Sequence, residues 1–519
     1  MTNSIGFKWI AEHLNIEAVQ TLMVESKVGT SRRTVIKPVR EETYAVAARP
    51  EPTIAANLAF GLKHELINLE FLARLFAVLD QRVLEEWVRH EPTGAYSRRA
   101  GFLFEWLTNR RLDIPDTPSG NYVDALDPDA YVVATRPVNV QRWRVRDNLP
   151  GTRDFCPTIR RTEAVRVVEH YDCMAALESL EVEFGTDVLM RSAVWLSIKE
   201  SRASFAIEHE EKQVDRMKRF AAVMERRCGV DDDPLAMKSL TGLQAEILGT
   251  ATRYGIRQSP VIVGHTHGFD NIVDYIGPPW ERSGDLLEGL RSSLARTAGA
   301  SPIVRASVAS FGFVYIHPMS DGNGRISRFL VNDVLRRDGA VPAPFILPIS
   351  ATIQNRARER AGYDRALETL SRPLMLKYQE DYRFGTEYAC PDGVRSNFYF
   401  DAYDDAMPAW RYPDLTSQTE YLGDIVRLTI EVEMSKEASV LRDIERAREN
   451  VKNHLEGPNS DIDQIIRSIR ENGWKVSNKL VKAFAPLADA TLAEAVIAGV
   501  RDVFEPALRD APADDSEHQ

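Results

Sequence analysis

The stretch IHPMSDGNGRISR, residues 316–328, decides how the rest of the chain is interpreted. Glycines at positions 322 and 324 flank Asn323 and directly precede residues 325–337, whose apolar side chains recur at helical spacing. Such a pattern predicts a helix that begins at the glycines. Glycine lets backbone N–H groups approach a ligand closely, and the N-terminus of a helix favours anions. The stretch therefore predicts a cradle for an anionic group.

Four polar side chains surround this predicted cradle. Arg325 and Arg328 lie one helical turn apart and project to the same side, and two guanidinium groups beside an anion site suit a polyphosphate. Asp321 stands just before the cradle, where a carboxylate can hold Mg²⁺ against phosphate oxygens. His317, at the end of the preceding helix, titrates near neutral pH and can act as a base. This set of side chains suits the transfer of a phosphate-containing group to a hydroxyl. The alternative interpretation is a plain turn between two helices, with a capping Asp and surface arginines.

The same stretch resembles the signature of the Fic family, HxFx(D/E)GNGRxxR. Every polar position matches, and the one departure is Met319, where Phe is usual. Met is an adaptable apolar residue, so we expect Met319 to anchor the loop in the core. The resemblance implies a mainly α fold: a helical Fic core with a short β-hairpin flap, flanked here by helical N-terminal and C-terminal domains. It also implies transfer of AMP from ATP to a Ser, Thr or Tyr hydroxyl of a target protein or of the chain itself.

The resemblance assigns a role to each polar position and gives the expected cofactors, ATP and Mg²⁺. The implied roles are general base for His317, Mg²⁺ ligand for Asp321, anion hole for Gly322, Asn323 and Gly324, and phosphate binding for Arg325 and Arg328. Downstream, Tyr363 and Leu367 fit part of the YYxxL pattern that lines the adenine site in many members, but Asp364 replaces the second Tyr. Recognition of adenine over another base is therefore left open. The resemblance covers about residues 192–367.

A second segment, Ser204 to His209, resembles the inhibitory motif (S/T)xxxE(G/N) of class II-like Fic proteins, within a helix expected near residues 195–212. His209 departs from the usual Gly or Asn. Ser204 and Glu208 lie one turn apart and can face the same partner. The resemblance implies that Glu208 pairs with Arg328 and blocks productive placement of the γ-phosphate. The alternative is that Glu208 belongs to a solvated run of charges over residues 208–212.

Residues 260–276 predict a β-hairpin, with apolar runs on both sides of a His265-Thr-His-Gly268 segment and Pro278 beyond its end. The resemblance implies that this hairpin is the flap, which would hold a segment of the target protein by strand addition. His265 and His267 form an HxH pair without an obvious third ligand. We therefore expect turn or target contacts there instead of a metal site.

Length and composition set the outer limits of the interpretation. The 519 residues carry 65 Lys+Arg and 76 Asp+Glu, so the formal net charge is 65 − 76 = −11, and 44% of residues are hydrophobic. These values are typical of globular proteins and exclude collagen-like and disordered classes for most of the chain. Neither a signal peptide nor a long apolar run is evident, and the four cysteines form no CxxC pair. A cytoplasmic protein without a membrane partner is expected.

The sequence predicts three domains and a tail. The expected limits are 1–155 for a mostly helical N-terminal domain with a loop-rich end, 156–380 for the Fic domain, 381–509 for a C-terminal helical region, and 510–519 for a frayed acidic tail. Residues 461–504 predict short helices that could be winged-helix-like. Six Lys+Arg oppose six Asp+Glu there, so an interaction role is favoured over nucleic-acid binding.

Several functional alternatives remain open at this level. The same site could use another donor, in UMP or phosphocholine transfer, or could remove AMP with Glu208 orienting water. A non-enzymatic alternative is a regulatory module that senses a nucleotide. The target protein, a homo-oligomeric state and whatever relieves the inhibition are not readable from the sequence.

Overall fold

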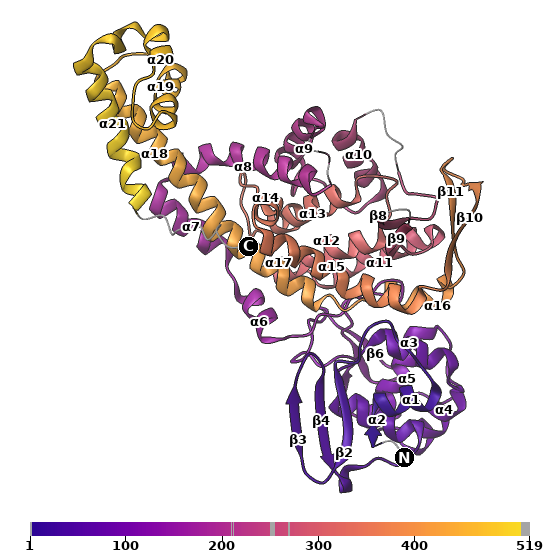
Figure 1. Cartoon of the computed structure of the whole chain (residues 1–519). Helices are drawn as coiled ribbons and strands as arrows, with labels where there is room; N and C mark the ends of the chain where they lie inside the picture. Colours follow the sequence, from indigo (N-terminus) through magenta and orange to yellow (C-terminus); the bar gives the residue numbers. More distant parts are fainter. Residues whose placement is uncertain (1–2, 209, 211, 250–254, 268–269, 510–519) are drawn as a thin grey trace. The chain divides into compact units, whose positions relative to one another are not determined.

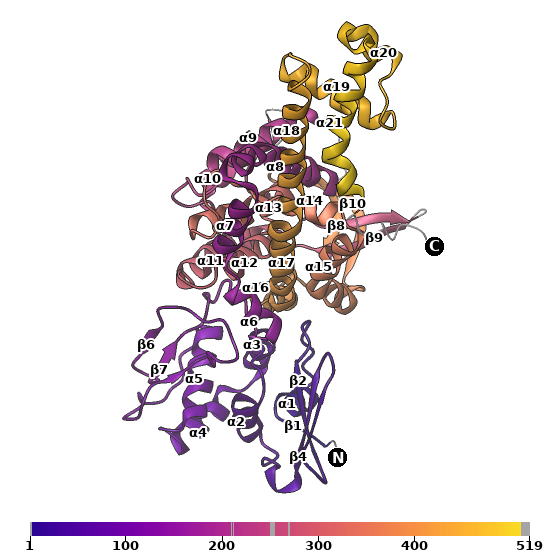
Figure 2. The ribbon, with the colours of Figure 1, turned by 90° about the vertical axis from the view of Figure 1, so that its left-hand side faces the viewer.

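The computed structural model describes residues 3–208, 210, 212–249, 255–267 and 270–509 (Figures 1 and 2). The chain is mainly helical, as expected, and it divides into two compact units. Unit 1 comprises Met1–Cys173 and Ser197–Leu428, and unit 2 comprises Met174–Leu196 and Thr429–Gln519. The division therefore groups residues 381–428 with the first unit, whereas the three-domain limits expected from the sequence stay a prediction.

The N-terminal part of unit 1 combines helices with two small sheets. Its helical segments are α1 (Phe7–Leu14), η1 (Val46–Ala48), α2 (Ile54–His64), α3 (Leu69–Val78), α4 (Gln81–His90) and α5 (Ala95–Thr108). One sheet has the order β1-β2-β4-β3, from β1 (Ser4–Ile5), β2 (Val24–Gly29), β3 (Arg33–Ile36) and β4 (Arg40–Ala45). The other has the order β5-β7-β6, from β5 (Val123–Asp124), β6 (Val138–Val140) and β7 (Val145–Asp147).

The helical packing of this part follows from a stripe of leucines at helical spacing. Leu58, Leu62, Leu69, Leu72 and Leu75 are all buried in one core with the neighbouring helices. The stripe is divided between two helices, since α2 ends at His64 and α3 begins at Leu69. Asn68 caps α3, and its side chain accepts a hydrogen bond from the N–H of Phe71.

The sequence predicted a mostly helical N-terminal domain and did not predict the strands at residues 4–45. In β2 the buried residues alternate, Val24, Ser26 and Val28 facing inward, but Glu25 and Lys27 lie between them. Charged residues are unfavourable in strands, so this alternation was too weak to indicate a sheet. β2 pairs with β4 in parallel, and the chain between them forms β3, which pairs with the other edge of β4. The pairing of β2 with β4 is therefore a non-local feature.

The rest of unit 1 is built around a hairpin and a cluster of helices. The helices before and after the hairpin are α6 (Glu163–His170), the end of α8 (Thr186–Ile207), α9 (Val214–Arg227), α10 (Met237–Leu248), η2 (Trp280–Arg282), α11 (Ser283–Arg296), α12 (Pro302–Ile316), α13 (Asn323–Arg337), α14 (Ile349–Gln354), α15 (Ala357–Tyr378), α16 (Tyr403–Arg411) and α17 (Thr416–Leu428). The strands are β8 (Ile262–His267), β9 (Asp270–Ile276), β10 (Tyr382–Ala389) and β11 (Arg395–Phe400).

Helix α12 lies at the centre of this part because it is apolar on every side. All but two of its residues are buried, Pro302 and Val314 being partly exposed, and a helix that is apolar all round belongs in a core. Pro302 occupies its first turn, where proline is favoured. Its one charged residue, Arg305, pairs with Asp338 at 3.0 Å. Helix α13 packs directly against α12, so the connecting loop 317–322 is held between two fixed helices.

Two antiparallel hairpins project from unit 1. The hairpin predicted at 260–276 is confirmed: β8 pairs with β9 from Ile262↔Ile276 to His267↔Asp270, and its expected turn at 268–269 lies outside the described residues. The second hairpin, β10–β11, was not predicted, because residues 391–413 contain many aromatic and turn-forming residues. In both views the two hairpins lie on the same side of the unit (Figures 1 and 2).

Unit 2 is helical throughout its described part. It contains α7 (Cys173–Phe184), the start of α8, the π-helical segment η3 (Thr429–Met434), α18 (Ser435–Lys452), α19 (Asn459–Glu471), α20 (Asn478–Ala483), η4 (Ala485–Ala488) and α21 (Ala490–Arg509). Its core is formed by apolar residues of α18, α19 and α21. Between 459 and 509 the described residues include helices but no strand, so the helical half of the winged-helix expectation is present and the wing is not.

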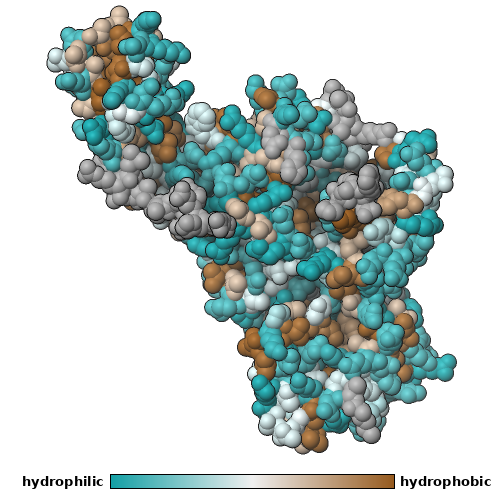
Figure 3. Space-filling model, viewed as in Figure 1, coloured by the Kyte–Doolittle hydropathy of each residue, from teal (hydrophilic) through white to brown (hydrophobic). Residues whose placement is uncertain are grey.

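The surface is predominantly polar on the face shown in Figure 3, with apolar residues in separate small patches. No helix among the described residues combines the length and the apolar character that crossing a membrane requires.

Candidate active site

The loop between α12 and α13 places His317 in an unusual backbone conformation. His317 ends α12 with φ 49° and ψ 54°, in the left-handed region, and its N–H donates to the carbonyl of Phe313. Non-glycine residues in this region are uncommon and concentrate at functional sites. The His317 Nδ1 lies 3.3 Å from the carbonyl oxygen of Val314. Because a carbonyl only accepts, Nδ1 carries the proton and Nε2 is left as an acceptor.

The charge state of His317 follows from its surroundings. Burial and the nearby guanidinium of Arg257 lower the pKa of the His317 imidazole to about 4. The ring is therefore neutral at physiological pH and able to accept a proton. Its carbonyl oxygen accepts a hydrogen bond from Arg257 Nε at 2.7 Å, which fixes the backbone on which the ring is mounted.

Asn323 holds the shape of the loop. Its Nδ2 donates to the carbonyl of Met319 and its Oδ1 accepts from the N–H of Met319, both at 2.9 Å. Met319 itself is 1% exposed, so it fills the core position expected for it. The side chain of Asn323 is thus committed to the loop, and only its backbone N–H is available to line an anion site.

Gly322 directly precedes α13, and Gly324 lies in its first turn. Gly322 caps the helix with φ 82°, a conformation that favours glycine. Asp321 accepts a hydrogen bond from the N–H of Gly322 at 2.6 Å, and its side chain stays 38% exposed. A Cβ on Gly324 would lie 2.1 Å from Oε1 of Glu208. The glutamate carboxylate therefore lies directly over the first turn of α13, where an anion is favoured.

Arg325 belongs to a chain of charges that leads from α9 to Asp321. Its Nη1 contacts Glu210 at 2.5 Å and its Nη2 contacts Asp321 at 3.1 Å. Glu210 also lies 3.6 Å from Arg216. The Arg325 guanidinium is 3% exposed, and its centre lies 5.1 Å from the ring centroid of Phe205. Among the described residues its Nε finds no hydrogen-bond partner.

Arg328 is held by the segment that the sequence predicted to be inhibitory. Its Nε donates to the hydroxyl of Ser204 at 2.8 Å, and its Nη2 donates to the Ser204 carbonyl at 3.1 Å and to Glu208 Oε1 at 2.7 Å. Burial disfavours ionisation of Glu208, but the charge of Arg328 outweighs it and lowers the Glu208 pKa. The pair is therefore ionised at neutral pH. Nη1 of Arg328 has no hydrogen-bond partner in the described part of the chain.

One cavity of about 300 Å³ joins most of the predicted site residues. Its lining comprises Glu208, Arg257, Ser259, Pro260, Val261, His317, Val394 and the continuous stretch Met319 to Arg325. Arg328 and Ser204 lie behind Glu208 and do not line it. Tyr363 is also outside this lining; burial raises the pKa of its phenol while the charge of Arg328 acts in the opposite direction, which puts Tyr363 beside Arg328.

Three contributions to the site were missed in the sequence. Glu210 looked like one member of a solvated charge run, yet it pairs with Arg325. Arg257 belongs to no recognised motif. Its position beside the apolar strand residues 260–263 is only a weak indication of a role in the site. Glu200, on α8, is fully buried and accepts hydrogen bonds from Ser350 N at 2.6 Å and Ser350 Oγ at 2.5 Å, and its charge helps to raise the pKa of Arg328. Its spacing of four from Ser204 could have placed it on the same helix face.

Among the described residues, no group of three or more His, Cys, Asp or Glu side chains could hold a metal ion. His265 Nδ1 lies 2.8 Å from Asp274 across the hairpin, with both side chains at least half exposed. This contact is a cross-strand pair.

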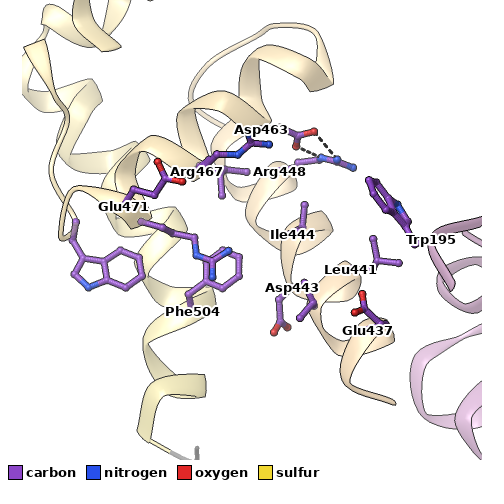
Figure 4. Close-up of a pocket in the computed structure, with 14 residues that line it drawn as sticks. Trp195, Glu437, Leu441, Asp443, Ile444, Arg448, Asp463, Arg467, Glu471 and Phe504 are labelled. Atoms are coloured by element: carbon purple, nitrogen blue, oxygen red, sulfur yellow. Dashed lines mark hydrogen bonds and ion pairs between the residues drawn. The ribbon is translucent and has the colours of Figure 1, made fainter. Parts of the chain in front are cut away.

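A larger cavity of about 880 Å³ lies within unit 2 (Figure 4). Arg448 and Asp463 of its lining form a two-point ion pair at 2.5 and 2.7 Å, and Trp195 and Phe504 contribute apolar surface. Both signs of charge are present, and no residue of the 316–328 stretch takes part. Residues of that stretch line the smaller cavity instead.

Comparison with known proteins identifies the family of the central segment. Residues 234–335 match the Fic/DOC family. The chain is 38% identical over 69 residues to protein adenylyltransferase fic-1 of Caenorhabditis briggsae, a match that covers 13% of each chain. It is 29% identical over 124 residues to protein adenylyltransferase fic-1 of Caenorhabditis elegans, covering 23% of this chain and 22% of that protein. The matches thus span less than a quarter of the length of these curated relatives.

Among solved structures, the chain is similar to a Fic family protein from Desulfovibrio desulfuricans G20. The TM-score is 0.35 at 18% sequence identity, over 60% of this chain and 87% of that one.

Proposed function

Residues 234–335 form a Fic/DOC domain, and from this premise we propose that the protein is an autoinhibited protein adenylyltransferase. It transfers AMP from ATP to a Ser, Thr or Tyr hydroxyl of a target protein or of itself. The observation that carries the proposal is the shared cavity: His317 and the N-terminus of α13 line the same space of about 300 Å³. A base and an anion cradle in one cavity suit the attack of a hydroxyl on a bound phosphate.

The proposed step is a displacement at the α-phosphorus. His317 Nε2 takes the proton of the acceptor hydroxyl, and the hydroxyl oxygen forms a bond to the α-phosphorus of ATP. The bond from that phosphorus to the bridging oxygen of the β-phosphate breaks, and pyrophosphate leaves with the electron pair. The target gains AMP and His317 the proton. The low pKa of His317, about 4, supports this role because the imidazole is neutral before substrate binds.

Unsatisfied donors support binding of a polyphosphate. The buried Arg325 Nε and Arg328 Nη1 lack hydrogen-bond partners among the described residues, and a buried donor without a partner is costly. Phosphate oxygens would satisfy both, and the backbone N–H groups at the start of α13 would add to the cradle. This donor set fits the phosphates of one nucleotide.

Asp321 fits a Mg²⁺ ion that arrives with the nucleotide. Mg²⁺ usually binds one or two carboxylates and fills its other positions with water and substrate phosphates. The Asp321 carboxylate stands at the mouth of the cradle and is 38% exposed, so it would hold the ion. Bound there, the ion would neutralise phosphate charge and stabilise the leaving group.

The inhibited state follows from competition for the same arginines. Glu208 lies over Gly324 and pairs with Arg328, while Glu210 pairs with Arg325. We propose that these two carboxylates occupy the positions of nucleotide phosphates, and that both must leave before a productive complex forms. The pair with Glu210 extends the inhibition expected from the sequence, which named Ser204 and Glu208 alone.

The target would bind along the β8–β9 hairpin by strand addition, with main-chain hydrogen bonds positioning the acceptor hydroxyl near His317. The four cysteines are free and buried, which agrees with a reducing compartment, so we propose the cytoplasm as the location.

A donor panel tests the proposal. The Glu208→Gly protein is incubated with Mg²⁺ and, separately, ATP, UTP or CDP-choline, alone and with a cell lysate, and the products are identified by mass. The account predicts an AMP adduct with ATP and none in the His317→Ala protein. UMP or phosphocholine adducts instead would reassign the donor, which the departure at Asp364 leaves open. Nucleotide binding without any adduct would favour a sensing module, and loss of AMP from a modified protein would favour the reverse reaction.

A further inference from the structure

The turn between β10 and β11, residues 390–394, lies beyond the segment that matches the family, yet it reaches the active-site cavity. Val394 lines the same cavity as His317. In both ribbon views the β10–β11 hairpin lies on the side of the unit that carries β8–β9 (Figures 1 and 2). The turn therefore forms part of the wall of the active-site cavity.

Asp392 ties the turn to the start of the β8–β9 hairpin. Its Oδ2 accepts hydrogen bonds from the N–H of Gln258 at 3.0 Å and from the hydroxyl of Ser259 at 2.8 Å. Its Oδ1 accepts from the N–H of Val394 at 3.0 Å. One carboxylate therefore fixes Val394 relative to the residues that lead into β8.

Arg257 in turn joins this segment to the catalytic loop. The guanidinium is 2% exposed and donates to the carbonyls of His317 and Pro278 at 2.7 Å and of Ser259 at 2.9 Å. Its backbone N–H donates to the Pro318 carbonyl at 2.9 Å. Both ends of the β8–β9 hairpin and the backbone of His317 are thus bound by a single side chain.

The part of the cavity wall nearest the hairpins is apolar. Pro260, Val261 and Val394 contribute apolar side chains to a lining that also includes the polar residues of the α13 N-terminus. An extended polypeptide on the β8–β9 hairpin that brings a hydroxyl to His317 would enter the cavity that Val261 and Val394 also line. A residue beside the acceptor would then face apolar side chains, where an unpaired charge is unfavourable.

We propose that the 390–394 turn is the second wall of the target site and selects an apolar residue beside the acceptor hydroxyl. This inference rests on the proposed function. The occupant is an extended segment of the target protein that carries a Ser, Thr or Tyr with an apolar neighbour. Asp392 and Arg257 are positioning residues, since they act through Val394, the hairpin and the His317 backbone.

The first test uses charge reversal at the wall. Synthetic peptides with one Thr and one varied neighbour are modified by the Glu208→Gly protein, and kcat/KM is compared for Leu, Lys and Asp neighbours. The expected order favours Leu. Adding Val394→Asp should shift the ratio of Lys to Leu by roughly tenfold, and Val394→Lys should shift the ratio of Asp to Leu similarly, because opposite charges attract and like charges repel across such a contact. Asn397→Asp, an exposed position on the same hairpin, should leave both ratios unchanged. Unaltered ratios in the Val394 variants overturn the proposal.

The second test does not depend on transfer. Hydrogen exchange is followed at Gln258 and in β8 for the Asp392→Ala and Asn397→Asp proteins. Faster exchange in Asp392→Ala alone supports the link between the turn and the hairpin, and equal protection in both overturns it. If the Glu208→Gly protein modifies no peptide and no protein while binding ATP, the proposed function fails, and the exchange result still decides whether the turn positions the hairpin.

Discussion

Glu208 Oε1 accepts a hydrogen bond from Arg328 Nη2 at 2.7 Å, directly above the first turn of α13. The carboxylate holds the guanidinium that would otherwise bind a phosphate, so replacing Glu208 frees both the arginine and the space over Gly324. We expect Glu208→Gly to raise the rate of AMP transfer at least tenfold. The measurement is incorporation of labelled AMP over time, with Asp215→Gly, an exposed carboxylate on α9, as the matched control. Equal rates in both variants would show that Glu208 does not inhibit.

Glu210 should act as a second, weaker inhibitory carboxylate. It pairs with Arg325 but remains 32% exposed, so solvent screens the contact. Glu210→Gln should tighten ATP binding by a few-fold, measured by calorimetry. Because Glu208 and Glu210 act on neighbouring arginines of one site, their effects on ATP affinity should be non-additive in the double variant. Strict additivity would indicate that the two pairs act separately.

His317 should be required for transfer and dispensable for nucleotide binding. Removal of a positioned general base typically lowers a rate by about 10²–10⁴-fold. The His317→Ala change in the Glu208→Gly background should cause a loss of this size while the ATP affinity changes less than about twofold. A lost affinity with an unchanged rate at saturating ATP would assign His317 to binding instead.

The pH dependence should reflect the low pKa of His317. The neutral imidazole is the active form, and its pKa is about 4, so activity is lost only as the pH falls through that value. kcat/KM for ATP, which reports on the free protein, should therefore be nearly constant from pH 7 to pH 5. An ordinary histidine, with a pKa near 6.5, would lose about twentyfold over the same range. Such a loss would contradict the proposed environment of the base.

Gly322 should be needed for the loop conformation. Its φ of 82° is strained for any residue with a side chain, and a Cβ would lie 3.3 Å from Leu248. Gly322→Ala should lower the free energy of unfolding by ~1–2 kcal/mol and weaken ATP binding. Gly284→Ala is the control, because it lies in α11 with nothing within 4 Å and alanine favours a helix. The two variants are compared by urea unfolding, and equal stability would contradict the strain at Gly322.

Features encoded in contiguous stretches were predictable from the sequence. The start of α13 at the glycines, the β8–β9 hairpin and the anchoring of Met319 each depend on residues within about a dozen positions of one another. The spacing of Ser204 and Glu208 predicted that both face one partner, and both do contact Arg328, although α8 ends at Ile207 and Glu208 directly follows it. In these cases the local pattern and the tertiary structure agree.

Contacts between distant segments were not predictable in the same way. Asp392 and Ser259 are 133 positions apart, and Glu210 and Arg325 are 115 apart. Neither pair has a local signal, because each carboxylate on its own looks like an ordinary surface charge. The parallel pairing of β2 with β4 is likewise set by tertiary packing. The residues outside the motif that hold the site in place could therefore not be identified from the sequence.

The most direct test of the account is the intact mass of the Glu208→Gly protein after incubation with ATP and Mg²⁺, alone and with a lysate. The account predicts a mass increase of one AMP on the protein itself or on a target, and no increase when His317→Ala is added. The absence of any AMP adduct with the Glu208→Gly protein, or an equal adduct without His317, would contradict it.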